Sequence, residues 1–144
     1  MKKSTKFSDV LHILLHMAES KDPITSDDLA KAMKTNPVVV RRTMAGLREQ
    51  GFVNSQKGHG GGWQLTCDLE NVTLHDVYVA IGAPTMIALG NRTDSSECIV
   101  EKAVNIATSD AFIDAEKALV SSLRETTLVD LNNIAARYSR KESL

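Results

Sequence analysis

The sequence predicts a mainly α-helical fold that contains one small β-hairpin and ends in a long helix. Two short amphipathic segments meet at the dipeptide Asn36-Pro37, a typical helix start. A glycine-rich stretch at residues 57–65, KGHGGGWQL, separates two strand-like segments. No glycine or proline interrupts residues 97–123, so one long helix is expected there.

Composition is that of an ordinary globular chain. The 144 residues are 42% hydrophobic and 24% charged, and no run reaches the roughly 18 apolar residues of a membrane span. The N-terminal VLHILLHMA is broken by two histidines and lacks a cleavage site for a signal peptide. We therefore expect a cytoplasmic protein without membrane contact, and the two cysteines indicate no disulfide framework.

Charge divides the chain into two parts. Residues 1–66 carry ten Lys/Arg against six Asp/Glu, whereas residues 67–144 carry seven against twelve. A basic first part is compatible with binding to a polyanion, although the same excess suits a solvated surface. We expect a first domain over residues 1–82 and a helical region over residues 83–144.

The first helix is expected to begin at Ser8 as N-cap and to run to about Ser20. Its predicted buried stripe consists of Val10, Leu11, Leu14, Leu15 and Ala18. His12 and His16 lie one turn apart, as in some metal sites. Because no HExxH arrangement or nearby cysteine accompanies them, we expect a packing or surface role and no metal.

Two further helices are predicted around a short turn at residues 34–36. Ser26 is expected to cap the first, and Asn36 caps the second with Pro37 at its first position. The second helix extends to about Gln50 and has two distinct faces. Val40, Met44 and Leu47 form its inner face, and Val38, Arg41, Arg42 and Ala45 lie on or beside the outer one.

The glycine-rich stretch lies between strand-like FVNSQ and WQLTC, which indicates a hairpin with a flexible tip. Neither the P-loop nor the dinucleotide-binding pattern fits this context. Two helices across a short turn followed by a hairpin make a winged helix-turn-helix. Its tip can approach DNA closely because glycine lacks a Cβ, and Lys57 and His59 would supply charge and hydrogen bonds.

The second half is predicted to be helical. A helix from Leu74 to about Ile81 precedes a loop capped by Ser95 or Ser96, and the long helix follows. Two stripes run along it, one of residues spaced by seven and one of small side chains: Ile99, Ile106, Ile113 and Val120, and Ala103, Ala107, Ala111, Ala115 and Ala118. One stripe can meet a partner and the other the body, which argues for a homodimer. A last helix, TTLVDLNNIAARYS, is expected to fold back.

The stretch NPVVVRRTMAGLREQGFVNSQKGHGGGWQL resembles the Rrf2 family of bacterial transcription regulators. Its asparagine-proline opening is most similar to the YwnA-type branch. The resemblance covers essentially the whole chain. It implies a homodimeric repressor that binds double-stranded operator DNA and whose long helix pairs two subunits. The residues expected at the DNA are Ser26, Asn36, Val38, Val39, Arg41, Arg42, Lys57, His59 and Gly60.

The chain departs from the family in its sensor. Cluster-binding members carry three cysteines around the start of the long helix, where this sequence has only Cys98, followed three residues later by Glu101. We expect Cys67 to pack, and no iron-sulfur cluster or other cofactor. Near a helix N-terminus the dipole favours the Cys98 thiolate, whereas Glu97 and Glu101 oppose it. A thiol redox sensor, control by an unidentified small molecule or protein effector, and a merely structural Cys98 all remain open.

An enzyme is not expected. No Ser/His/Asp or Cys/His arrangement is readable, and the four histidines, at positions 12, 16, 59 and 75, are scattered. The alternative function is a winged-helix module that binds proteins and not DNA.

Overall fold

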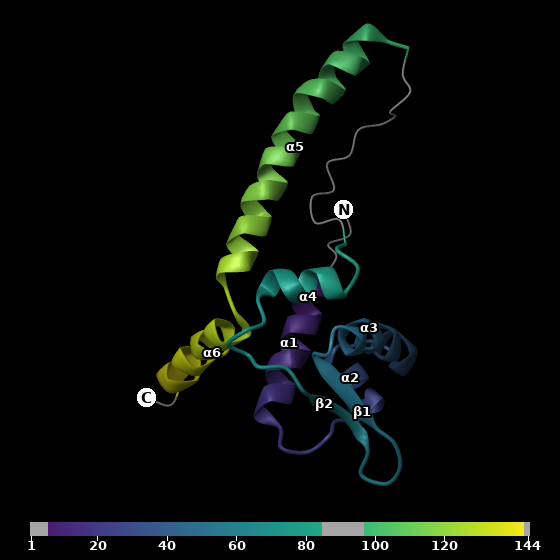
Figure 1. Cartoon of the computed structure of the whole chain (residues 1–144), viewed down its shortest axis with the longest axis vertical. Helices are drawn as coiled ribbons and strands as arrows, with labels where there is room; N and C mark the ends of the chain where they lie inside the picture. Colours follow the sequence, from purple (N-terminus) through teal and green to yellow (C-terminus); the bar gives the residue numbers. More distant parts are fainter. Residues whose placement is uncertain (1–5, 85–96, 143–144) are drawn as a thin grey trace.

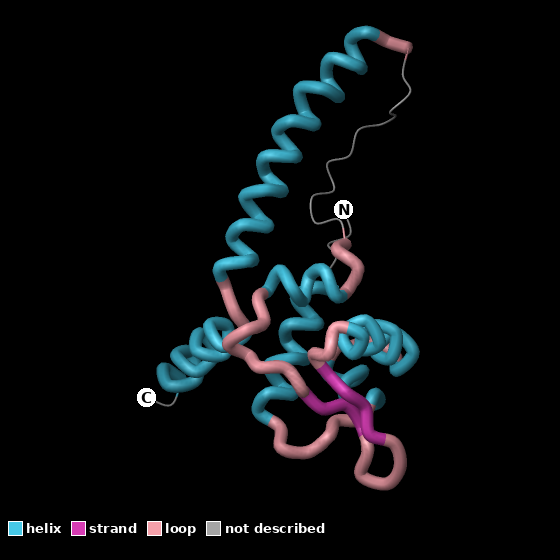
Figure 2. Tube along the Cα trace, viewed as in Figure 1, coloured by secondary structure: helices cyan, strands magenta, loops and turns pink. Residues whose placement is uncertain are grey.

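A computed structural model of the chain describes residues 6–84 and 97–142, which form six helices and one two-stranded antiparallel hairpin. The body consists of α1 (Lys6–Glu19), α2 (Ser26–Ala32), α3 (Pro37–Glu49), β1 (Val53–Gln56), β2 (Gly62–Leu65) and α4 (Leu74–Ala80). α5 (Ile99–Glu125) projects from this body as an arm. α6 (Leu128–Glu142) follows at the lower end of the arm and lies to one side of the body (Figures 1 and 2). The predicted mainly helical fold with a small hairpin is confirmed.

The register of α1 differs from the prediction. The helix begins at Lys6, so Ser8 is not its N-cap, and its buried residues are Val10, Ile13, Leu14 and Met17. Of the predicted stripe, Leu11, Leu15 and Ala18 are only half-buried. Apolar residues occupy seven of the nine positions from Val10 to Ala18, so periodicity alone leaves the inward face ambiguous.

The start of α2 also needs correction, because Thr25 and not Ser26 is the N-cap. Thr25 Oγ1 accepts a hydrogen bond from the Asp28 amide at 3.2 Å and donates to the Asp28 carboxylate at 2.8 Å. Both residue types make good caps, and the sequence offered them side by side. After α2 the chain turns through Lys34, whose backbone φ of 54° is uncommon for a residue other than glycine.

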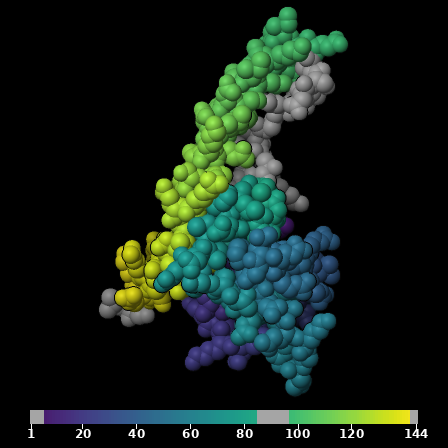
Figure 3. Space-filling view, in the orientation of Figure 1, coloured from purple at the N-terminus to yellow at the C-terminus, as the bar shows by residue number. Residues whose placement is uncertain are grey.

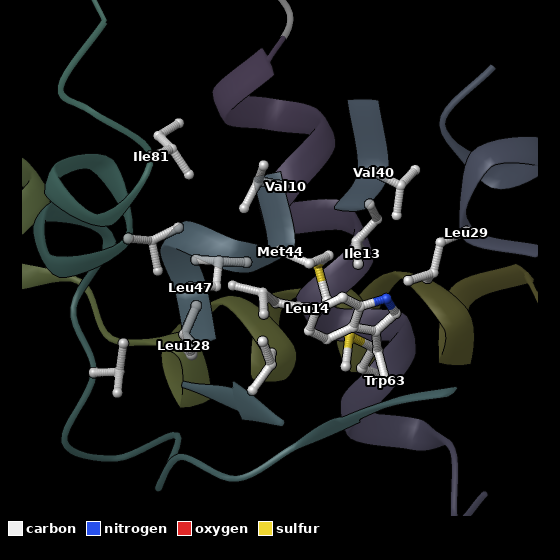
Figure 4. Packing of buried hydrophobic residues seen from close by; sticks show 14 of the residues in the cluster. Val10, Ile13, Leu14, Leu29, Val40, Met44, Leu47, Trp63, Ile81 and Leu128 are labelled. Carbon is white, nitrogen blue, oxygen red and sulfur yellow. The ribbon is translucent and has the colours of Figure 1, made fainter. Parts of the chain in front are cut away.

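α3 follows the sequence prediction closely. The Asn36 side chain accepts from the amides of Val38 and Val39, each at 3.1 Å, and Pro37 occupies the first turn. Val40, Met44 and Leu47 are fully buried. Figure 4 shows them in one cluster with residues of α1, with Trp63 from β2 and with Leu128 from α6.

The hairpin pairs β1 with β2 from Val53↔Leu65 to Gln56↔Gly62. A third segment joins it, because Ile24 and Trp63 exchange backbone hydrogen bonds of 2.9 and 2.7 Å. This approach requires Gly62: a Cβ there would lie 2.6 Å from the Ile24 carbonyl oxygen. The wing is therefore fastened at its base to the segment that leads into α2.

A second short pairing joins the two halves of the chain. Thr73 and Thr127 form an antiparallel bridge, flanked by hydrogen bonds from the Leu74 amide to the Thr126 carbonyl and from the Leu128 amide to the Val72 carbonyl, both 2.9 Å. We call residues 72–74 and 126–128 the joint. Thr73 with Asp76 and Thr127 with Asp130 make two reciprocal capping pairs at the joint. Hydrogen bonds from Thr127 lower the pKa of the Asp130 carboxyl.

α5 has no buried residue over its 27 positions. Among the described elements it contacts the body at α4, and it projects away from the other described helices (Figure 3). The expectation that one apolar stripe packs on the body is therefore wrong: all five alanines of the second stripe are exposed. The helix begins at Ile99 with Cys98 as N-cap, whereas the expected capping residues, Ser95 and Ser96, lie outside the described residues.

Within residues 6–84 and 97–142, no helix combines the length and the hydropathy that crossing a bilayer requires.

Gly46 provides a test of the contact between α3 and α4. Alanine in place of glycine ordinarily stabilises a helix interior by about 0.5–1 kcal/mol. A Cβ at position 46 would lie 2.6 Å from the Ala80 carbonyl oxygen, a backbone atom that cannot turn aside as a flexible side chain could. We expect Gly46→Ala to lower the free energy of unfolding by about 1–3 kcal/mol in urea. Glu49→Ala, at an exposed position of the same helix, should change it by less than about 0.5 kcal/mol. A Gly46→Ala protein as stable as the parent would contradict this packing.

Candidate nucleic-acid interface

The outer face of α3 presents two valines and two arginines. Val38 is 58% exposed, and Val39, Arg41 and Arg42 are exposed as well. They lie outward because the buried residues of α3, from Val40 to Leu47, take the opposite face. Neither arginine is in an ion pair with another described residue, since Lys31 and Asp28 form the one such pair there. This face therefore presents exposed apolar side chains beside two guanidinium groups that form no ion pair with another described residue.

Asn36 has a more constrained role than the sequence suggested. Its Oδ1 is occupied by the amides of Val38 and Val39. Only its side-chain NH₂ group remains to donate outside the protein. Asn36 thus positions the first turn of α3, and any direct contact that it makes must use that NH₂ group.

Ser26 is tied to the wing and does not cap α2. Its Oγ accepts a 2.9 Å hydrogen bond from Trp63 Nε1, and the indole also lies 5.9 Å from the Arg48 guanidinium carbon. The Ser26 hydroxyl proton stays available to an acceptor. Sequence reasoning missed this link. Its one signal is the single tryptophan of the chain, directly after the glycines, because a largely buried indole usually requires an acceptor.

The wing tip consists of Lys57, Gly58, His59 and Gly60, all exposed. Gly58 and Gly60 have φ of 96° and 75°, which glycine adopts without strain. The structure thus brings Ser26 to the base of the wing, while no described hydrogen bond or ion pair links the tip to Arg41 or Arg42. Tip and helix face are separate surfaces of one body.

The two cysteines lie in different environments. Cys98 is exposed at the start of α5, the end of the arm farthest from the body (Figure 1). Cys67 is half-buried against the core, where burial raises the pKa of its thiol, as Asp68 also does to a lesser extent, against a backbone hydrogen bond. Among the described residues, no group of three or more histidine, cysteine, aspartate or glutamate side chains could hold a metal ion.

Known proteins match the chain over most of its length. The sequence model of the Rrf2 family, described as "Iron-dependent Transcriptional regulator", matches residues 3–134. YwnA of Bacillus subtilis, described as a putative HTH-type transcriptional regulator, is 25% identical over 90% of this chain and 96% of its own. Protein rrf2 of Nitratidesulfovibrio vulgaris is 28% identical over 91% and 87%.

Solved structures share the fold. A putative transcriptional regulator from Lactobacillus plantarum superposes with a TM-score of 0.74 at 21% identity, covering 97% of this chain and 99% of the other. CymR of B. subtilis, the global cysteine regulator, superposes with a TM-score of 0.64 at 24% identity, covering 93% and 98%. The family match, which spans the helix-turn-helix, the wing and α5, shows that this chain belongs to the Rrf2 family of DNA-binding transcriptional regulators and is not an enzyme.

Proposed function

We propose that the protein is a homodimeric repressor that reads operator DNA with the outer face of α3. The observation that carries this is the uncovered set Val38, Val39, Arg41 and Arg42 on one helix face. A recognition helix needs such a set, because arginine pairs with guanine or phosphate and small apolar groups contact thymine methyls. Lys57, His59 and Gly60 contact the sugar-phosphate backbone or minor groove from the wing, and Ser26 and Asn36 contribute phosphate contacts.

Residues 1–82 form the DNA-binding domain in this proposal, and residues 83–144 pair two subunits. Support comes from the exposure of α5: Ile99 is 82% exposed, Ile106 68% and Ile113 49%. A hollow of about 450 Å³ on the same helix is lined by Ile113, Glu116, Lys117, Val120, Ser121 and Arg124. An apolar helix face of this length is stable in water when a second helix covers it.

Repression follows from occupancy, since a dimer that covers a promoter excludes polymerase. Transcription in vitro from a bound promoter should fall as the protein is added. The affinity for that operator should fall steeply with salt, because each phosphate contact releases counterions. A protein that binds its target without such salt dependence would favour the protein-interaction alternative.

The arginines of α3 give the first functional test. Arg41→Ala or Arg42→Ala should cost about 1–3 kcal/mol of operator binding where the side chain reads a guanine, with specificity relaxed at one base pair. A phosphate contact should instead weaken all sequences alike. Binding is measured by titration at fixed salt. Arg137→Ala removes the same charge from α6 and should leave the affinity nearly unchanged. Full affinity in both α3 variants would exclude this helix as the reader.

Dimerisation is tested at the centre of α5. Ile106→Glu places a charge in the proposed seam, where its desolvation is costly, and should give folded monomers by analytical ultracentrifugation. Asn133→Glu adds the same charge at an exposed position of α6 and should remain dimeric. Circular dichroism checks that both proteins are folded. A dimeric Ile106→Glu protein would place the interface elsewhere.

The family description names iron, but this chain lacks the cysteines that an iron-sulfur cluster needs. An iron-sulfur cluster is held by several thiolates, and this chain has two cysteines, one of which is half-buried with a raised pKa. The residues present do not fit such a cluster. We propose instead that oxidation of the exposed Cys98 thiol controls DNA binding. One solved structure of this fold, Staphylococcus aureus CymR, is of an oxidized form.

Cys98 lies at the far end of the arm, so oxidation there alters the element that spaces two reading helices. Hydrogen peroxide oxidises the thiolate to a sulfenic acid with release of hydroxide, and two equivalents of a thiol reductant restore the Cys98 thiol while forming their own disulfide and water. We expect mild peroxide to weaken operator binding and Cys98→Ser to abolish the response with reduced-state affinity intact. Because burial disfavours the Cys67 thiolate, alkylation at neutral pH should label Cys98 first. A serine variant that still responds would transfer the signal to Cys67 or to a non-covalent effector.

A further inference from the structure

A histidine pair on α1 stands apart from the surfaces described so far. His12 and His16 are both exposed, on the side of the helix opposite its buried residues Val10, Ile13, Leu14 and Met17. Their Nε2 atoms are 2.8 Å apart, and their rings are 4.5 Å apart between centroids at an angle of 54°. The two nitrogen donors therefore converge on one point above the helix.

The sequence alone predicts no metal at this pair, but from the convergence of the two rings we propose that His12 and His16 form a chelating site for a divalent transition-metal ion of the copper or nickel type. Imidazole nitrogen is a preferred donor for these ions. The i, i+4 spacing on a regular helix holds both rings on one face, so little conformational entropy is lost when the second ring binds.

The separation of the donors selects the geometry. With metal–nitrogen bonds of about 2.0–2.1 Å, two ligands at a right angle lie about 2.8–3.0 Å apart, and two tetrahedral ligands about 3.3–3.4 Å. The observed 2.8 Å matches the right angle, which tetragonal copper(II) and nickel(II) adopt. Structural zinc, which takes four protein ligands in a tetrahedron, fits less well, since no third protein ligand completes a group in the described part of the chain. Water fills the remaining positions.

Without metal, the same distance is that of an N–H···N hydrogen bond between two neutral rings of opposite tautomer. The ion takes the place of the shared proton, and both rings must then be neutral. Binding is therefore in competition with protons and weakens as the solution is acidified. Neither histidine belongs to the proposed DNA surface, to α5 or to the cysteines, so the inference does not depend on the proposed function.

Nickel(II) binding to the tag-free full chain tests the proposal by calorimetry under reducing conditions. We expect one ion per chain and at least a tenfold loss of affinity in each of His12→Gln and His16→Gln. His59→Gln, which removes an exposed histidine from the wing, is the matched control and should bind as the parent does. Because both positions of the pair are exposed, the variants should keep the parent's circular dichroism.

Copper(II) added to protein with alkylated thiols gives a second reading. Its electron paramagnetic resonance spectrum should show two imidazole nitrogens in the parent and fewer in either variant, and copper(II) should bind more tightly than nickel(II). Equal nickel affinity in the parent and both variants, or an equal loss in His59→Gln, would overturn the proposal. So would a copper spectrum that the two substitutions leave unchanged.

Discussion

The pairing at the joint determines how the arm is held. α5 buries none of its own residues, so its direction is set by the segment that follows it, where Thr127 pairs with Thr73. Leu128, next in the chain, is fully buried in the core of the first half. The two backbone hydrogen bonds of the joint and the buried Leu128, together with the contact between α5 and α4, hold a helix of 27 residues, about 40 Å long at 1.5 Å per residue.

The joint also connects the arm to the reading helix. α4 begins at Leu74, which belongs to the joint. The last residue of α4, Ala80, lies against α3 at Gly46. The contact is so close that a Cβ at position 46 would lie 2.6 Å from the Ala80 carbonyl oxygen, so α3 and α4 are closely packed at this point. In the dimer proposed above, this contact would connect the angle between two arms to the position of α3. Two half-sites lie about 34 Å apart, and a rigid connection of this kind is what allows arm geometry to set the spacing of the helices.

Local rules predicted the parts of the fold that depend on neighbours in sequence. Asn36 with Pro37 specified the start of α3, and its buried stripe could be read from spacing alone, as could the hairpin. The prediction was wrong where two neighbouring residues, or two faces of a helix, carry equivalent sequence signals. Thr25 and Ser26 are both good caps, and tertiary structure decided between them because the Trp63 indole takes the Ser26 hydroxyl. The same holds for α1, whose apolar residues surround most of the helix, so that only the packing partner selects the inward face.

The alanine stripe shows a different limit of sequence reasoning. Small side chains on a second face of α5 suggested that the body covers it, and in the structure the body lies elsewhere. Apolar residues indicate that a surface is to be covered, but not by what. On α5, the five alanines and Ile99, Ile106 and Ile113 are all exposed, so in the proposed dimer the partner would cover more of the helix than a single seam. In the proposed dimer, association and ordering of the arm would be one equilibrium, because the structure describes no buried residue on α5. A signal at Cys98 would act on that shared equilibrium and not on a preformed rigid dimer.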